Sequence, residues 1–337
     1  MPLKIYEEPL KGIQQIVAIA AGKGGVGKST VTVGLAYALT KLGYSVGILD
    51  ADVYGPSIRK MMGEEKLPYQ EEGKLFPAET RGIKLMSMAY FRKEGSSDAV
   101  RAPVASSIVT QFLKEISWGP LDFLLVDFPP GTGDIQLTLC QQAKFSGALM
   151  VTTPQEVAVI DVKKAIDLFK KVDVPVLGVV ENMSYYLSSG SSEPVYLFGK
   201  DGGKRLSATA FVPFLGEIAI EPSICRTLEE GQPLFHPAFG SLAEKLISQL
   251  VGEAETKFYK DDKQLIVEWP DGIKKRIRFS DLQKRCPCAA CNTPSVEEAV
   301  GATHIESVGR YAVKIAFTSG CSKGIYPFNF IREISSI

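Results

Sequence analysis

A glycine-rich octapeptide decides the fold of this chain: Gly22-Lys23-Gly24-Gly25-Val26-Gly27-Lys28-Ser29, followed by Thr30. The octapeptide fits the P-loop pattern G-x-x-x-x-G-K-[ST] and carries a second lysine inside the loop. An apolar run at 15–21 precedes it and predicts a buried strand, and a helical pattern from Ser29 to Leu42 follows it. A P-loop requires this order of strand, loop and helix, so we expect the loop to bind a nucleoside triphosphate.

Each residue type in the loop suits a phosphate ligand. Glycines let successive backbone N–H groups converge on phosphate oxygens, and the following helix adds the positive end of its dipole. Lys28 is expected to lie between the β- and γ-phosphates. Ser29 is expected to offer its hydroxyl to Mg²⁺, a cation that favours oxygen ligands.

Aspartates at the ends of two other apolar runs are candidates for the same site. Asp127 ends the run at 123–126 and would hold the water shell of the magnesium ion. Asp50 and Asp52 end a run that starts at Ser45, and a carboxylate there can orient or polarise the attacking water. The alternative is that these aspartates only cap strand ends and turns.

Hydrophobic patterning divides the chain into two domains. Residues 1–252 alternate apolar strands with helical patterns, which predicts an α/β fold with a doubly wound, mostly parallel sheet covered by helices on both faces. A polar, charged stretch at 253–262 is interpreted as a linker. Residues 263–337 are expected to form a small β-rich domain that begins with a hairpin around the turn at 270–272.

Four of the six cysteines lie in the second domain: Cys286, Cys288, Cys291 and Cys321. Two histidines and no apparent N-terminal hydrophobic signal favour a reducing, cytoplasmic location. In such a compartment, clustered cysteines more often serve metal or redox chemistry than disulfides. Four thiolates suit tetrahedral Zn²⁺ and also suit an iron–sulfur cluster, and the spacing does not decide between them. Reactive thiols and simple buried cysteines are the remaining alternatives.

Composition argues against two classes of partner. The chain has 38 basic and 38 acidic residues, and the basic residues at 274–278 alternate with apolar ones as on a solvated strand face, so nucleic-acid binding is not expected. No stretch approaches the roughly 20 apolar residues of a spanning helix, and the C-terminal residues are too few for an amphipathic anchor, so membrane binding is not expected either.

Four stretches together are similar to a known family: Lys23–Thr30, Asp50–Ser57 (D-A-D-V-Y-G-P-S), Asp127–Asp134 (D-F-P-P-G-T-G-D) and Val180–Tyr185 (V-E-N-M-S-Y). The first is the deviant P-loop of the class that includes MinD, ArsA and the nitrogenase iron protein. In combination, the four closely resemble the Mrp/ApbC iron–sulfur cluster carriers over roughly residues 12–250.

This resemblance implies an ATPase that acts as a nucleotide-gated homodimer and passes clusters to apo iron–sulfur proteins or other assembly factors. Lys23 would reach across the dimer to the partner's nucleotide, and Asp52 would position the attacking water. Asp127 would be the magnesium-side carboxylate. The side chain of Asn182 would read adenine, since an amide both donates and accepts hydrogen bonds.

The chain departs from the family at one place. Cluster carriers usually have a C-x-x-C pair shortly after the V-E-N-M-S-Y stretch, whereas Ser188 and Ser191 have that spacing here. Serine is a poor substitute because clusters are held by soft thiolates. Either the usual cluster site is lost or changed, or ligands come from elsewhere in the chain. The alternative function is a nucleotide-switched regulator or scaffold with a structural zinc site.

The second domain resembles the N-terminal domain of γ-butyrobetaine hydroxylase-like proteins. The similarity lies in Val267–Gly272, the block Cys286–Cys291 and the stretch Gly320–Tyr326. In that family, three cysteines and a later histidine bind zinc. Cys321 falls about where the histidine is expected, so the resemblance suggests zinc bound by four thiolates, with His304 a weaker candidate for the fourth ligand.

Overall fold

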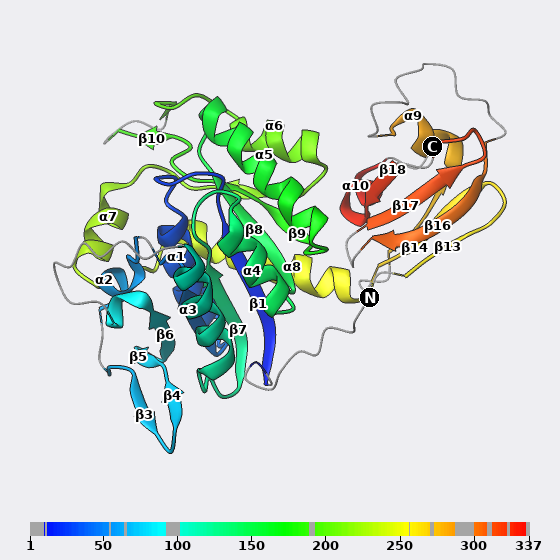
Figure 1. The fold of residues 1–337 in the computed structure, drawn as a ribbon. Helices are drawn as coiled ribbons and strands as arrows, with labels where there is room; N and C mark the ends of the chain where they lie inside the picture. The colour runs from blue at the N-terminus through cyan, green and yellow to red at the C-terminus, as the bar shows by residue number, and fades with distance from the viewer. Residues whose placement is uncertain are drawn as a thin grey trace. The chain divides into compact units, whose positions relative to one another are not determined.

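The computed structural model describes residues 10, 12–53, 55–63, 66–91, 102–188, 193–255, 257–269, 273–286, 300–308, 312–321 and 324–334. The chain forms two compact units (Figure 1). Unit 1 contains Met1–Ala210 and Phe214–Lys245, and unit 2 contains Phe211–Pro213 and Leu246–Ile337. None of the helices in these described ranges is long and apolar enough to cross a membrane.

Unit 1 is built on an eight-stranded sheet with the order β12-β9-β8-β1-β7-β2-β6-β5. All neighbouring strands are parallel except β5 and β6. The central strands are continuous runs of buried apolar residues, as expected when both faces of a parallel sheet are covered. The strands are β1 (Ile13–Ala20), β2 (Val46–Asp50), β5 (Ala78–Thr80), β6 (Ile83–Ser87), β7 (Leu121–Asp127), β8 (Gly147–Thr152), β9 (Val176–Glu181) and β12 (Phe214–Glu217).

Helices connect these strands and cover the sheet (Figure 1). In α5, Glu156 lies in the first turn and two lysines lie in the last, an arrangement that complements the helix dipole. The helices are α1 (Lys28–Lys41), α2 (Ile58–Met62), α3 (Ala102–Glu115), α4 (Asp134–Gln142), α5 (Glu156–Lys171), α6 (Gly202–Ala210), α7 (Pro222–Glu229) and α8 (Pro237–Glu255), with a short 3₁₀ helix η2 (Met88–Tyr90). The α/β fold expected from the sequence is confirmed.

Two small antiparallel hairpins extend this unit. The first pairs β3 (Tyr69–Glu71) with β4 (Lys74–Phe76), and the second pairs β10 (Tyr186–Leu187) with β11 (Pro194–Val195). Ser188 directly follows β10, whereas Ser191 lies outside the described residues.

Unit 2 contains two three-stranded antiparallel sheets around its own core. The hairpin expected around 270–272 is present, because Glu268 pairs with Lys274. The elements are β13 (Lys257–Lys260), β14 (Gln264–Glu268), β15 (Lys274–Arg278), α9 (Phe279–Lys284), β16 (Ala302–Val308), β17 (Ala312–Phe317), β18 (Gly324–Pro327) and α10 (Phe328–Glu333).

The linker expected at 253–262 requires a correction. Helix α8 continues to Glu255, and β13 at Lys257–Lys260 pairs along its whole length with β14. The charged residues concealed this strand because β13 is an edge strand: Phe258 packs against the core of unit 2 while both end lysines are exposed.

Candidate functional site

The P-loop connects the central strand β1 to α1, and its glycines are required by close contacts. Gly25 and Gly27 have φ values of +82° and +81°, which residues with a Cβ atom rarely adopt. A Cβ atom on Gly27 would also lie 2.1 Å from Nδ2 of Asn182. A Cβ atom on Gly22 would lie 2.1 Å from the carbonyl carbon of Asp161 in α5. The loop is therefore held between α5 and Asn182.

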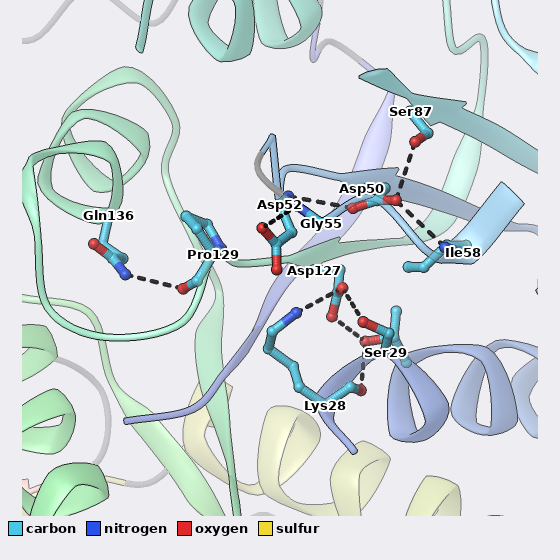
Figure 2. A network of polar contacts seen from close by, with 11 residues as sticks. Lys28, Ser29, Asp50, Asp52, Gly55, Ile58, Ser87, Asp127, Pro129 and Gln136 are labelled. Atoms are coloured by element: carbon cyan, nitrogen blue, oxygen red, sulfur yellow. Dashed lines mark hydrogen bonds and ion pairs between the residues drawn. The ribbon is translucent and has the colours of Figure 1, made fainter. Parts of the chain in front are cut away.

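Asp127 gathers the polar side chains at the start of α1 (Figure 2). Its Oδ2 atom accepts hydrogen bonds from Nζ of Lys28 and Oγ of Ser29, both at 2.7 Å. Oγ1 of Thr32 lies 2.7 Å from the other carboxylate oxygen. Lys28 and Asp127 are both buried, so their ion pair is shielded from solvent. The structure thus brings together three of the residues expected from the sequence and adds Thr32.

Asp50 is a second buried carboxyl group beside Asp127, because β2 and β7 are neighbours in register. Its oxygens accept hydrogen bonds from the backbone N–H of Asp52, the hydroxyl of Ser87 and, at 3.4 Å, the N–H of Ile58. Burial first, and the charge of Asp127 second, raise the pKa of Asp50 to about 7, against the opposing effect of Lys28.

Asp52 and Lys23, two of the expected catalytic residues, are half-buried. Asp52 lies in the loop after β2, where its Oδ1 accepts a hydrogen bond from the N–H of Gly55 at 3.2 Å (Figure 2). Within the described part of the chain, the ammonium group of Lys23 forms no hydrogen bond or ion pair. Asp52 thus lies close to Asp127 and the side chains that contact it, whereas Lys23 forms no hydrogen bond with any of them.

Asn182 joins the P-loop to a cavity of about 510 Å³. Its side-chain Nδ2 donates to the carbonyl oxygen of Val26 at 2.9 Å, and its backbone N–H donates to Thr152. The cavity is mostly apolar and opens beside the loop. Its lining comprises Thr30, Pro56, Ser57, Lys60, Met61, Asn182, Met183, Ala219, Ile220, Glu221, Ile224, Cys225, Leu228 and Glu229.

Sequence reasoning did not find most of these cavity residues. They come from α2, α7 and the loop after β12, which lie far apart in the sequence and follow no short motif. The only signal was the apolar spacing of α7, which is equally typical of a helix packed on a core.

In unit 2 the structure brings two of the four expected cysteines together. Sγ of Cys286 and Sγ of Cys321 lie 3.8 Å apart, and both residues are half-buried. A Cβ atom on Gly324 would lie 3.2 Å from Sγ of Cys286, so glycine leaves the thiol its space. Cys288 and Cys291 lie outside the described residues. His304 is exposed and lies 3.7 Å from a carboxylate oxygen of Glu306.

Comparison with known proteins places these two units in families. A family model described as NUBPL iron-transfer P-loop NTPase matches residues 12–254. The chain belongs to the NUBPL iron-transfer P-loop NTPase family. Residues 256–332 match a second model, described as gamma-butyrobetaine hydroxylase-like, N-terminal. Both resemblances inferred from the sequence motifs are confirmed, and the P-loop unit is a nucleotide-binding unit of this family.

Several relatives of this NTPase family are similar over most of unit 1. An iron-sulfur cluster carrier protein of Aquifex aeolicus is 42% identical over 251 residues, which are 71% of this chain and 69% of the relative. The iron-sulfur cluster carrier protein of Escherichia coli K12 is 41% identical over 263 residues, or 75% and 71% of the two chains. An Arabidopsis thaliana iron-sulfur protein required for NADH dehydrogenase is 43% identical over 243 residues, or 72% and 78%.

Solved structures support the same fold. A nucleotide-binding protein from Archaeoglobus fulgidus, in complex with ADP, has a TM-score of 0.61 and 38% identity, and the match covers 68% of this chain and 92% of that one. The ATP complex of McdA(D38A) from Cyanothece has a TM-score of 0.50 at 15% identity, over 70% and 96% of the two chains, and supports the fold alone.

Proposed function

We propose that this NTPase hydrolyses ATP as a homodimer and carries iron–sulfur clusters to apoproteins or other assembly factors. The observation that carries the nucleotide part of this proposal is the convergence of Lys28, Ser29 and Thr32 on the buried Asp127. The cargo is inferred from relatives above 40% identity that are named as iron–sulfur cluster carriers.

The residues around Asp127 fit a magnesium-bound triphosphate. Oγ of Ser29 and a carboxylate oxygen of Asp127 lie 2.7 Å apart, and Mg²⁺ favours such hard oxygen ligands. Mg²⁺ would neutralise charge on the phosphates, with Ser29 as a direct ligand and Asp127 holding its water shell. Lys28 would donate to the β- and γ-phosphates. Asp52, half-buried in the loop after the adjacent strand β2, would orient the attacking water.

The cavity beside Asn182 suits the base of the nucleotide. Its walls are apolar at Met183, Ile220 and Ile224, which matches the faces of an adenine ring. The Asn182 amide lies at the junction of this cavity and the P-loop. We therefore assign Asn182 to base recognition as well as to the support of the loop.

Homodimerisation is supported by the surface next to Lys23. Val157 and Ile160, in the first turns of α5, are exposed apolar side chains. Helix α5 packs against Gly22 at the start of the P-loop through the backbone of Asp161, the residue directly after Ile160, so this part of the helix lies beside the loop. A second copy that covers this surface would bring its nucleotide toward Lys23, whose charge would then act on the transferring phosphoryl group.

The Lys23→Ala variant tests the dimer-dependent part of the proposal. The specific ATPase activity of the parental protein is expected to rise with protein concentration as dimers form, and Lys23→Ala is expected to lose at least tenfold in kcat. Lys74→Ala, which removes an exposed lysine of β4 away from α5, is the matched control and should retain the parental rate. If Lys23→Ala hydrolyses ATP as fast as the parent, the cross-dimer role of Lys23 is wrong.

The thiol pair of unit 2 is the proposed place for the cargo, because Ser188 stands where a cysteine is usual in the carriers. Two thiolates bound to one metal ion at about 2.3 Å and tetrahedral angles lie about 3.8 Å apart. The Sγ atoms of Cys286 and Cys321, 3.8 Å apart, match this geometry. The pair therefore suits two thiolates on one iron of a cluster, with Cys288 and Cys291 as the further proposed ligands.

The same separation favours one alternative function. Two thiolates on a tetrahedral zinc ion have this geometry too, and the match to the γ-butyrobetaine hydroxylase-like domain covers the same residues. Unit 2 would then be held together by a structural metal, and unit 1 would act as a nucleotide-switched scaffold or regulator. The colour of the protein after anaerobic reconstitution with iron and sulfide separates the two functions, since zinc is colourless.

A further inference from the structure

The loop between Asp127 and α4 has few backbone N–H donors in its first half, because two of its residues are prolines. It begins with Phe128, Pro129 and Pro130, continues with Gly131, and leads through 132–133 into the helix. The two prolines have no N–H groups, so this half of the loop can be fixed only through its carbonyl groups and the residues on either side. What holds those carbonyls therefore determines the course of the chain immediately after Asp127.

One side chain holds both proline carbonyls. Nε2 of Gln136 donates to the carbonyl oxygen of Pro129 at 2.9 Å and to that of Pro130 at 3.0 Å. A primary amide can do this because its nitrogen carries two hydrogens. Gln136 lies in the first turn of α4, is 3% exposed, and points toward Pro129 (Figure 2).

The other side of the loop is fixed to the strand that leads into the P-loop. The N–H of Phe128 donates to Ile19 at 3.0 Å, and the N–H of Gly131 donates to Ala21 at 3.1 Å. Ala21 directly precedes the P-loop. Gly131 has a φ of +97°, and residues 132–134 beyond it are exposed, so the fixed part of the loop ends at Gly131.

We propose that Gln136 is a positioning residue for ATP hydrolysis, which fixes the loop after Asp127 against the P-loop strand by holding the carbonyls of Pro129 and Pro130. Asp127 and the start of this loop face the phosphate site, so their relative position controls how the triphosphate and its magnesium ion are held during reaction. The inference rests on the proposed ATPase function.

The role of Gln136 depends on the hydrogen bonds that its amide donates and not on the volume of its side chain. Methionine at 136 would fill a similar volume but leave the buried carbonyl of Pro129 and the part-buried carbonyl of Pro130 without this donor. Glutamate at 136 would keep the length and shape, yet as a carboxylate it donates nothing, and when burial keeps it protonated it has one hydrogen to donate instead of two. A residue that only filled the core would tolerate methionine well.

The test compares Gln136→Met with Gln141→Met, which makes the same change at an exposed position of the same helix. We expect Gln136→Met to lower kcat for ATP at least tenfold, equivalent to about 1.4 kcal/mol in activation free energy. KM for ATP and affinity for ADP should stay close to parental values, whereas the melting temperature should fall by a few degrees because two carbonyl groups lose their donor. Gln141→Met should match the parent in all four measurements.

Two results would overturn the inference. The first is a parental kcat in Gln136→Met; the second is a parallel decline of kcat, ADP affinity and melting temperature, which indicates a purely structural role. If Gln136→Met does not fold, Gln136→Glu decides by the same criteria, with the same loss of kcat expected. A parental protein without ATPase activity overturns the proposed function as well, whereas an active parent with an equally active variant overturns only the role of Gln136.

Discussion

Removal of the Lys28 ammonium group is expected to destabilise unit 1 even without nucleotide. Lys28 and Asp127 form an ion pair at 2.7 Å, with side chains only 7% and 0% exposed. Breaking such a buried pair by truncating one partner costs about 3–5 kcal/mol, because a buried charge is left uncompensated. Ser29 and Thr32 still contact the Asp127 carboxylate, so we expect the lower end of this range, about 3 kcal/mol, for Lys28→Met.

Urea unfolding of the nucleotide-free protein measures this effect. Of the two tryptophans, Trp118 is buried in unit 1 and Trp269 lies in unit 2, so Trp118 fluorescence in a Trp269→Phe background reports on unit 1. With a urea dependence of about 3 kcal/mol/M, the midpoint should fall by about 1 M. The control is Lys66→Met, which breaks an exposed pair and should change stability by less than about 1 kcal/mol.

A double-mutant cycle isolates the charge pair. Lys28→Met combined with Asp127→Asn leaves no buried charge at this pair, so the double variant should be more stable than the sum of the two single changes predicts, by about 2 kcal/mol. If the single effects add to within about 0.5 kcal/mol, or if Lys28→Met behaves like the exposed control, the account of a buried, mutually dependent pair is refuted.

Further predictions concern a glycine of each unit and the second buried carboxyl group. Gly27→Ala should weaken ADP binding at least tenfold in calorimetry, because its Cβ would displace Asn182, whereas Gly240→Ala, in α8 with open space around the added Cβ, should bind normally. The pKa of Asp50 is raised from 3.8 to about 7, so its contribution to stability falls as pH rises through this range. Asp50→Asn should therefore stabilise the nucleotide-free protein most at pH 8, less at pH 5 and little near pH 3.8, in paired urea titrations. Gly324→Ala should reduce metal binding by unit 2, measured by metal analysis of the purified variant, because its Cβ would lie 2.7 Å from the Tyr326 ring and 3.2 Å from Sγ of Cys286 and would displace both.

The P-loop and the strand ends around it could be predicted because their signals are local. The apolar run before Gly22 leads into the glycine-rich loop and the run before Asp127 ends in a carboxylate, and parallel strands bring such ends to one edge of the sheet. The sequence could not give the order of the strands. It is this order that places Asp50 opposite Asp127 and raises the pKa of Asp50.

Contacts between distant segments were less accessible to sequence reasoning. The Asn182 side chain was assigned to adenine by resemblance, and its hydrogen bond to Val26, 156 positions away, has no signature in either segment. Gln136 looked like an ordinary helix residue, since a glutamine follows helical patterning equally well when it is exposed. The edge strand β13 was missed because its lysines follow the composition of a linker.

Metal and acid-labile sulfide analysis of anaerobically purified protein tests the carrier function most directly. The matched variants are Cys286→Ser and Cys321→Ser, with Cys225→Ser, an exposed cysteine of unit 1, as the control. Our account predicts iron together with sulfide in the parent and in Cys225→Ser, and the loss of both in the two unit 2 variants. Zinc without sulfide, lost in the same two variants, would contradict cluster carriage by these cysteines and favour the scaffold function.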